Sequence, residues 1–271
     1  MGDSLSGLPK DEIHGNIARV TQRVLAGNGA SSQRGAVDED VLLRQELRQE
    51  LHHRRQRSGR LTTMGDCDLC EQLAAAEYAL GHKDAAIQLY VEAENVRREL
   101  RVMSSSDGAS LLVALGAAKG EQGDMAGAIR CFQEAKSIHE RLGTIRTLDG
   151  AFVLANYGAA VGAAGDFDRA IKLLERSKTI RVEEDALFTP EGAFVLTNLG
   201  TAHVKKKEWD RALEHLTQAR SIRKYCHTYE TIAGAMLMRQ MAAVYGAIGD
   251  HERQEACEAE QFRIEGSQMT R

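Results

Sequence analysis

Three features of this sequence have residue types that carry out chemistry in other proteins: a cysteine pair, several histidines and a glycine-rich turn. Cys67 and Cys70 have the Cys-x-x-Cys spacing of half a zinc site or of a redox pair. No second cysteine or histidine pair completes a set of four ligands. Gly27-Asn28-Gly29 is not followed by the glycine and helix that a phosphate-binding loop needs. We therefore expect Cys70 to be a core residue, and we expect no metal and no cofactor.

The nine histidines do not form a His-Glu-x-x-His motif. His203 and His215 fall on the two helices of one predicted unit, where we expect one in a packing position and the other on a partly exposed face. We find no nucleophile that is spaced to meet both a base and an orienting group, as covalent catalysis requires. The sequence therefore offers no catalytic residue and predicts a protein that is not an enzyme.

The helices that carry these residues recur with a fixed period. Gly81, Gly123, Gly165 and Gly249 fall on a series with a spacing of 42 residues, and Lys207 occupies the one position of that series without a glycine. Such self-similarity indicates one supersecondary unit that is copied five times and stacked as a solenoid. Solenoids present a long surface to other molecules, so the period favours binding over catalysis.

Each unit carries the start and stop signals of two helices. A hydroxyl residue opens the first helix, because its side-chain oxygen accepts a hydrogen bond from a free amide at the helix start. The five predicted N-caps are Thr63, Ser105, Thr147, Thr189 and Thr231. The loop glycine ends the first helix, since glycine adopts the left-handed conformation easily. A longer second helix then extends to the next N-cap, and small residues such as Ala170 recur where the helices cross.

This period sets the predicted domain boundaries. Residues 1–62 lie outside it and predict a helical, partly flexible N-terminal extension, with apolar stripes at residues 13–24 and 43–51. The five units span residues 63–104, 105–146, 147–188, 189–230 and 231–266. The last helix is polar at Gln254 and Glu258, as is typical of a terminal cap. Residues 267–271 form a predicted tail.

Composition excludes several classes of protein. The 271 residues include 35 Lys and Arg against 39 Asp and Glu, which is not basic enough to indicate nucleic-acid binding. No apolar run approaches the ~20 residues that span a bilayer. Five cysteines at irregular spacing indicate reduced thiols, so we expect a cytoplasmic protein. Gly2 and Ser6 satisfy the N-myristoylation pattern, but Asp3 and the lack of a nearby basic cluster argue against membrane attachment.

The pattern Leu-x-x-Leu-Gly…Gly-Asp…Ala-Ile…Phe-x-x-Ala, found at residues 112–135, resembles the tetratricopeptide repeat (TPR). That unit ordinarily has about 34 residues, whereas this one has 42 and a longer second helix. Residues 193–200, residues 219–224 and the linker at residues 189–193 are similar to the repeats of kinesin light chains and nephrocystin-like proteins. The resemblance covers residues 63–266 and implies an all-α fold, a right-handed α-solenoid of helix-turn-helix units.

In that family the first helices line a concave groove that holds an extended peptide. By register, Asn156 and Asn198 occupy the position where relatives use asparagine to bracket the ligand backbone, and Gln240 occupies it in the last unit. An amide offers a donor and an acceptor, which match a peptide group of any sequence. The alternative is that these amides only solvate an exposed helix face.

Further residues of the predicted groove favour particular side chains in the ligand. Phe152, Phe194 and Met236 recur once per unit, and an exposed row of large apolar residues needs a partner. The alternative is that they pack against the neighbouring repeat. Lys205 and Arg239 add positive charge that suits an acidic ligand.

The sequence thus predicts a non-catalytic adaptor or scaffold that binds a protein or peptide partner, with acidic or aromatic anchor residues, in the groove. A second interpretation stays open, in which the chain is a permanent structural subunit of a larger cytoskeletal or transport assembly. Such a subunit would use the convex face or the N-terminal helices. The sequence does not decide the oligomeric state, or whether the N-terminal helices dimerise, cap the solenoid or occupy the groove.

Overall fold

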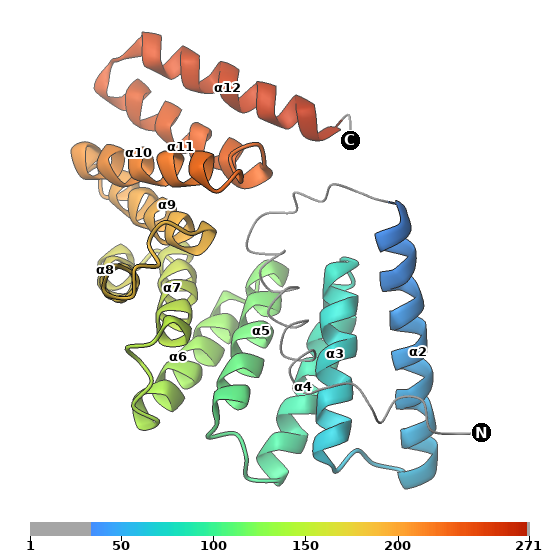
Figure 1. The fold of residues 1–271 in the computed structure, drawn as a ribbon. Coiled ribbons are helices and arrows are strands. Elements are labelled where there is room, and N and C mark those ends of the chain that lie inside the picture. The colour runs from blue at the N-terminus through green and yellow to red at the C-terminus, as the bar shows by residue number, and fades with distance from the viewer. Residues whose placement is uncertain (1–33, 270–271) are drawn as a thin grey trace.

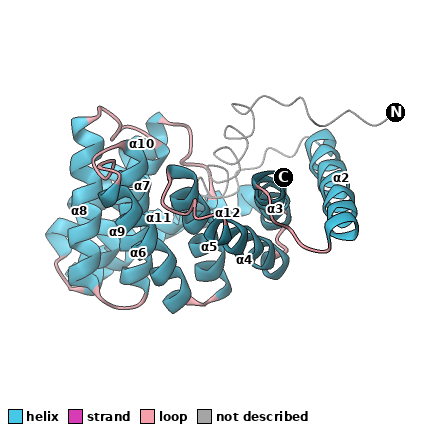
Figure 2. Cartoon of the chain, turned by 90° about the horizontal axis from the view of Figure 1, so that it is seen from below, coloured by secondary structure: helices cyan, strands magenta, loops and turns pink. Residues whose placement is uncertain are grey.

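The computed structural model describes residues 34–269, and this part of the chain is built from α-helices without a strand (Figures 1 and 2). The helix that precedes the repeats is α2 (Arg34–Ser58). The repeat helices are α3 (Met64–Ala79), α4 (Lys83–Glu99), α5 (Ser106–Gln122), α6 (Met125–Arg141), α7 (Leu148–Ala163), α8 (Phe167–Glu183), α9 (Pro190–Lys205), α10 (Trp209–Tyr225), α11 (Ile232–Ile248) and α12 (His251–Met269). The predicted helical stripe at residues 13–24 and the pattern at Gly2 lie outside the described residues.

All five predicted N-caps are confirmed. In each case the hydroxyl oxygen accepts a hydrogen bond from the backbone amide three residues further on, at 3.1–3.4 Å. In the first unit Asp66 also completes a capping box, because its carboxylate accepts the backbone N–H of Thr63. The start of each first helix is therefore fixed by its own sequence.

The residues predicted to end the first helices also adopt the expected left-handed backbone conformation. The glycines of the series have φ angles between 80° and 97°, and Lys207 adopts the same left-handed region at 61°. The structure adds a second series that the sequence analysis did not identify, at the ends of the second helices. Its members also have left-handed φ angles; they are Arg101, Gly143, Asp185 and His227.

We expect the substitution Lys207→Gly to raise the free energy of unfolding by about 0.5–1 kcal/mol. A side chain with a Cβ is strained in the left-handed region by roughly 1–2 kcal/mol, and the greater entropy of an unfolded glycine offsets part of that gain. Thermal and urea unfolding would measure the change. As a control, Lys205→Gly alters a helical residue and should be destabilising by about 1 kcal/mol; stabilisation by both variants would contradict the explanation.

The units stack into a curved solenoid. The two helices of each unit pack against each other, and each second helix packs against the first helix of the next unit. The first helices also contact one another, α5 with α7, α7 with α9 and α9 with α11, whereas successive second helices among those described have at most marginal contact. A stack whose members lie closer on one side bends towards that side. The first helices therefore form the concave face (Figure 1).

Close contact between the two helices of a unit depends on the small residues predicted there. A Cβ atom on Gly158 would lie 2.7 Å from Leu174, and one on Gly200 would lie 2.6 Å from Leu216. Ala170, which faces the same contact, is completely buried. Glycine and alanine at these positions allow the helix backbones to approach each other.

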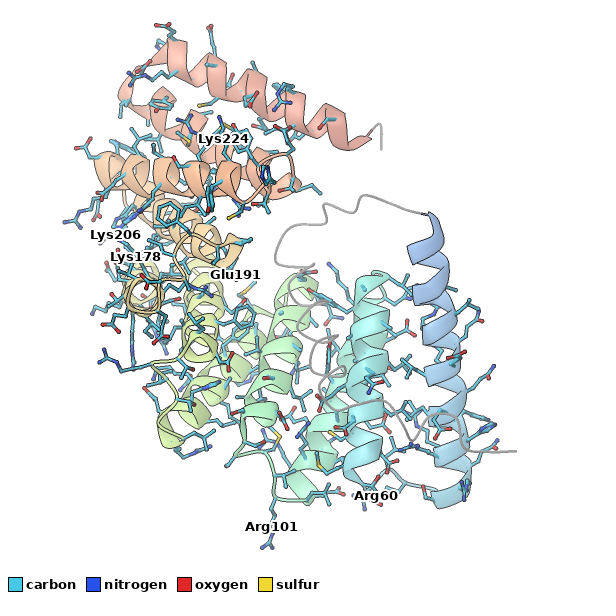
Figure 3. The ribbon with its side chains drawn as sticks, viewed as in Figure 1. Arg60, Arg101, Lys178, Glu191, Lys206 and Lys224 are labelled. Carbon is cyan, nitrogen blue, oxygen red and sulfur yellow. The ribbon has the colours of Figure 1, made fainter. Side chains whose placement is uncertain are left out.

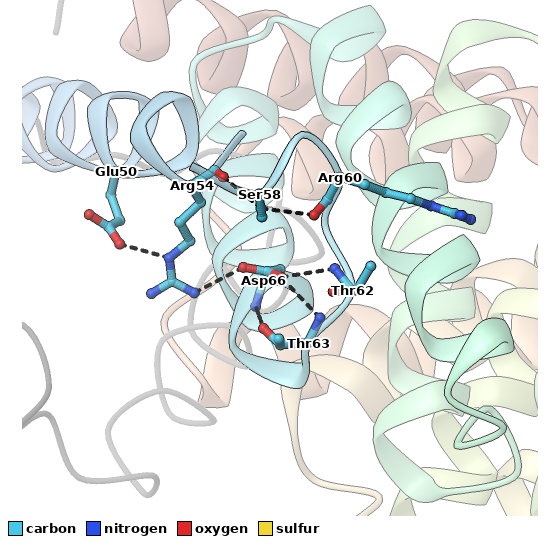
Figure 4. A network of polar contacts seen from close by, with 7 residues as sticks. All are labelled: Glu50, Arg54, Ser58, Arg60, Thr62, Thr63 and Asp66. Atoms are coloured by element: carbon cyan, nitrogen blue, oxygen red, sulfur yellow. Dashed lines mark hydrogen bonds and ion pairs between the residues drawn. The ribbon is translucent and has the colours of Figure 1, made fainter. Parts of the chain in front are cut away.

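The helix α2 packs on α3 through the buried side chains of Leu47 and Leu51. Polar contacts complete this interface (Figure 4). Arg54 donates to Glu50 at 2.7 Å and to Asp66 at 3.2 Å, so it joins the end of α2 to the capping box of α3. Part of the N-terminal extension thus covers the first repeat.

At the other end of the chain, α12 packs on α11 and buries Cys257 and Ile264 in the same core cluster as residues of the fourth unit. The helix α12 continues to Met269 and so includes the first residues of the predicted tail at residues 267–271. None of the helices in the described ranges combines the length and the apolar character that a membrane crossing requires.

Candidate functional site

The residues predicted to bind a ligand lie on three neighbouring helices of the concave face. They are Phe152 and Asn156 on α7, Phe194, Asn198 and Lys205 on α9, and Met236, Arg239 and Gln240 on α11. Since α7 contacts α9 and α9 contacts α11, the fold brings these side chains onto one continuous layer.

The two asparagines make the same hydrogen bond within their own helices. The side-chain amide of Asn156 donates to the carbonyl of Phe152 at 2.9 Å, and Asn198 donates to Phe194 at 2.9 Å. Among the described residues nothing donates to either side-chain oxygen, which leaves an acceptor available. The two asparagines differ in solvent exposure: Asn156 is only 7% exposed, whereas Asn198 is half-buried. The alternative of a merely solvated amide is therefore wrong for Asn156, which lies in the middle of the stack.

The predicted apolar row is not uniform. Phe152 and Phe194 are half-buried and pack against the core, whereas Met236 is 49% exposed. Arg239 is exposed three residues further along α11, whereas the exposed Lys205 is the last residue of α9. The open apolar surface therefore belongs to the last unit, beside Arg239.

The structure adds a charged group that the sequence analysis did not select. Arg223, near the end of α10, is only 3% exposed, and its Nε and Nη1 atoms are buried without a hydrogen-bond partner. Burial lowers the pKa of its guanidinium. Arg181 occupies the same position one unit earlier, is 4% exposed and also has its pKa lowered by burial.

This position carries a base in the first four units: Arg97, His139, Arg181 and Arg223. In the first unit the base pairs with Glu71 of α3 at 2.8 Å and lies 3.9 Å from Asp68, so the position faces the first helix of its own unit. Acidic residues in the first helix of the next unit also interact electrostatically with the base at this position. They are Asp107 in α5, Asp149 in α7 and Glu191 in α9, each of which raises the pKa of the base that precedes it.

The fourth unit breaks this rule, because Ala233 stands where the next acid would be. Arg223 consequently lies, by register, between α9 and α11 with no carboxylate paired to it among the described residues. A comparison of positions 107, 149, 191 and 233 in the sequence would have revealed this unpaired base. An isolated buried charge is unfavourable, so it indicates a missing partner.

His203 and His215 form a buried pair between α9 and α10. Their rings stack with centroids 5.4 Å apart, and both residues are at most 5% exposed. The Nδ1 of His203 lies 2.7 Å from Glu208, and the Nε2 of His215 lies 3.6 Å from Glu175. The expectation that one ring lies on a partly exposed face is wrong, because the two rings fill the space between the helices together.

The cysteines behave as core residues. Cys67 and Cys70 are fully buried free thiols, which confirms the prediction for Cys70. Burial raises the pKa of both thiols, that of Cys70 to about 12, so neither is a ready nucleophile. In the described ranges no three His, Cys, Asp or Glu side chains come together as a metal site.

Comparison with known proteins agrees with the repeat assignment. Residues 109–181 match the family model described as tetratricopeptide repeat. No curated protein matches the sequence. Repeats of this type generally mediate contacts between proteins and are typically found in scaffolds rather than enzymes.

Several solved structures have the same fold. BtubC (BKLC) from P. vanneervenii shares 21% identity over 94% of this chain and 92% of its own, with a TM-score of 0.64. A putative kinesin light chain of Podosopora anserina, with nearly identical TPR-like repeats, shares 16% identity over 73% and 94% of the two chains, with a TM-score of 0.59. The apo form of RapI shares 14% identity over 94% and 74%, with a TM-score of 0.63. The predicted all-α repeat fold is thereby confirmed.

Proposed function

Because this chain has the fold of a TPR-like helical repeat protein, we propose that it is a non-catalytic adaptor that binds an extended segment of a partner protein. The segment lies along the concave face formed by α7, α9 and α11. The observation that carries this proposal is the buried, unpaired guanidinium of Arg223, which by register lies between two of these helices. A carboxylate of the ligand is the partner that this group lacks.

The charge pattern of the repeats supports this ligand. Arg97 forms an ion pair with Glu71, and the charge of Glu191 acts to raise the pKa of Arg181 although burial lowers it overall, so a base at this position ordinarily has an acid of the protein near it. A carboxylate from a ligand would form charge-assisted hydrogen bonds with Arg223, which are about twice as strong as bonds between neutral groups. Lys205 and Arg239 carry positive charge on the same helices and would attract acidic residues that flank the anchor.

The remaining predicted residues have complementary roles. The side-chain oxygen of Asn198 is placed to accept a backbone N–H of the ligand, because its nitrogen is already bound to Phe194. Met236 offers an exposed apolar contact for an aromatic or aliphatic side chain. Asn156 and Phe152 are less accessible and would mainly shape the face. Reduced buried thiols fit a cytoplasmic location for this complex.

The test measures two properties of the Arg223→Met variant, its free energy of unfolding and its capture of partner proteins. Arg223→Met should raise the free energy of unfolding by about 1–3 kcal/mol, because it removes an unpaired buried charge at similar volume. The same variant should lose partners that wild type captures from a cytosolic extract. Arg181→Met is the matched control, since that base has the acid Glu191 near it, and this variant should retain the partners.

Gain of stability together with loss of capture would identify Arg223 as a binding residue, because a purely structural residue would not separate the two effects. Capture of the same partners by Arg223→Met would contradict the proposed site. If those partners also co-purify at fixed stoichiometry, the result would instead favour a permanent subunit that uses the convex face or the N-terminal helices.

A further inference from the structure

Two exposed aromatic residues meet at the junction between the third and fourth units, and neither belongs to a first helix. Phe188 lies in the loop that leads into α9, and Tyr225 is the last residue of α10. They are 61% and 73% exposed, yet their rings form an edge-to-face pair with centroids 6.3 Å apart and an interplanar angle of 88°. The Sγ of Cys226 donates to the carbonyl of Phe188 at 3.6 Å and holds the loop against the helix end.

The equivalent positions at the two preceding junctions are polar. Ser104 accepts a hydrogen bond from Arg141 at 3.4 Å, and Arg146 forms an ion pair with Glu183 at 3.0 Å. Stacking of the units is therefore achieved without aromatic residues at this position. The exposed pair at residues 188 and 225 needs an explanation other than stability of the solenoid, because large apolar groups in contact with water favour a partner.

Two acidic residues precede Phe188 in the chain. Glu184 and Asp185 are exposed in the same loop, and neither forms an ion pair with a described residue. The equivalent residues at the two preceding junctions are Leu100 and Arg101, and Leu142 and Gly143. Burial raises the pKa of Cys226, Glu191 also raises it and Arg223 lowers it, so charges of both signs act on the thiol that holds this loop. We call Glu184, Asp185, Phe188 and Tyr225 the aromatic–acidic patch.

Among the described residues, no cation lies over the two rings of this patch or pairs with Glu184 or Asp185. Lys224 is adjacent to Tyr225 in the sequence, but its Nζ lies 4.8 Å from the ring centre of Tyr229 instead (Figure 3). In the described part of the chain no arginine or lysine lies over the ring of Phe188 or Tyr225. The rings and the carboxylates therefore remain available to a cation from outside.

We propose that the aromatic–acidic patch binds an arginine- or lysine-bearing segment of a partner protein. A guanidinium or ammonium group would lie against the ring faces, where the electron density attracts cations, and would reach Glu184 or Asp185 with its hydrogen-bond donors. Arginine fits better than lysine, because its planar group stacks on aromatic rings and pairs with carboxylates at the same time. This surface uses no residue of the first helices and takes a ligand of opposite charge.

The decisive variant copies the polar pair of the preceding junction. Phe188→Arg combined with Tyr225→Glu places an arginine and a glutamate where Arg146 and Glu183 stand, and it leaves the net charge unchanged. The probe is a fluorescent peptide of alternating arginine and glycine with blocked ends, measured by anisotropy. We expect the double variant to bind it about tenfold more weakly than wild type, the loss of roughly two cation–π contacts.

Three comparisons complete the test. The same peptide with citrulline in place of arginine is neutral and should bind weakly to both proteins. Glu184→Gln with Asp185→Asn should also weaken arginine binding, and asparagine tolerates the left-handed backbone of position 185. His53→Gln, which changes an exposed residue of α2, is a matched control and should bind the peptide like wild type. Two results would overturn the proposal. One is that wild type and the aromatic double variant bind the arginine peptide equally well. The other is that wild type binds the citrulline peptide as tightly as the arginine peptide.

Discussion

Replacing Gly192 with alanine is expected to lower the free energy of unfolding by about 3 kcal/mol. A Cβ atom at this position would lie 1.9 Å from the carbonyl oxygen of Leu187. That oxygen belongs to the backbone, so it cannot move aside as a flexible side chain can. The loop between the units or the start of α9 would have to shift, and this shift would disturb the contact with the preceding unit.

The same contact recurs at every junction between units. A Cβ atom on Gly108, Gly150 or Gly234 would lie 1.8–2.4 Å from the carbonyl oxygen five residues earlier. At the starts of α5, α7, α9 and α11, the incoming loop crosses the first turn so closely that only the hydrogen atom of a glycine fits. Asp66 holds the equivalent position in the first unit, where it completes the capping box instead.

The control is Gly120→Ala in the last turn of α5. Its Cβ would lie 3.6 Å from Ala128, an ordinary contact, so alanine should raise the free energy of unfolding by about 0.5–1 kcal/mol through its helix propensity. Urea unfolding at 25 °C would measure both variants. Similar stability of Gly192→Ala and Gly120→Ala would show that the junctions tolerate a side chain and that this account of the stacking is wrong.

These glycines illustrate what the sequence reveals and what it does not. The period, the N-caps and the small residues at helix crossings were predictable, because each depends on a local signal that is repeated. The second left-handed series was not found, since Arg101, Asp185 and His227 carry no glycine to mark it. Residues of many types adopt that backbone when the tertiary structure favours it.

Burial on the concave face was harder to predict than the fold. Asn156 is buried because α7 has first helices on both sides, which is a property of the stack and not of residues 152–156. Arg223 depends on an acid that is absent ten residues later, at Ala233. That pairing crosses from one unit to the next, so it becomes visible only when the units are compared position by position.

The buried histidine pair leads to a second large effect, on the pH dependence of stability. Burial lowers the pKa of His215, and Lys178 and His203 lower it further, while Glu175 and Glu214 act in the opposite direction. The unfolded chain therefore takes up the proton first, near the ordinary histidine pKa of about 6.5. Stability is fully present above that pH and is lost as the pH falls through the lower pKa of the folded state.

We expect His215→Leu to remove most of this loss between pH 7.5 and pH 5.5. Leucine occupies the equivalent position at Leu89 and Leu173, so the variant copies the packing of other units. It also removes the buried Nδ1 atom that has no partner, which should raise stability at neutral pH by about 1 kcal/mol or more. The measurement is the free energy of unfolding in urea at several pH values.

The matched control is His53→Gln, which alters an exposed histidine on α2 and should keep the pH dependence of wild type. A residual slope is expected in His215→Leu, because burial also lowers the pKa of His139. The same pH dependence in His215→Leu and wild type would mean that the stacked pair accepts a proton without strain. In that case the nearby carboxylates, Glu208 beside His203 and Glu175 beside His215, would stabilise the protonated imidazole enough to offset the cost of burying its charge.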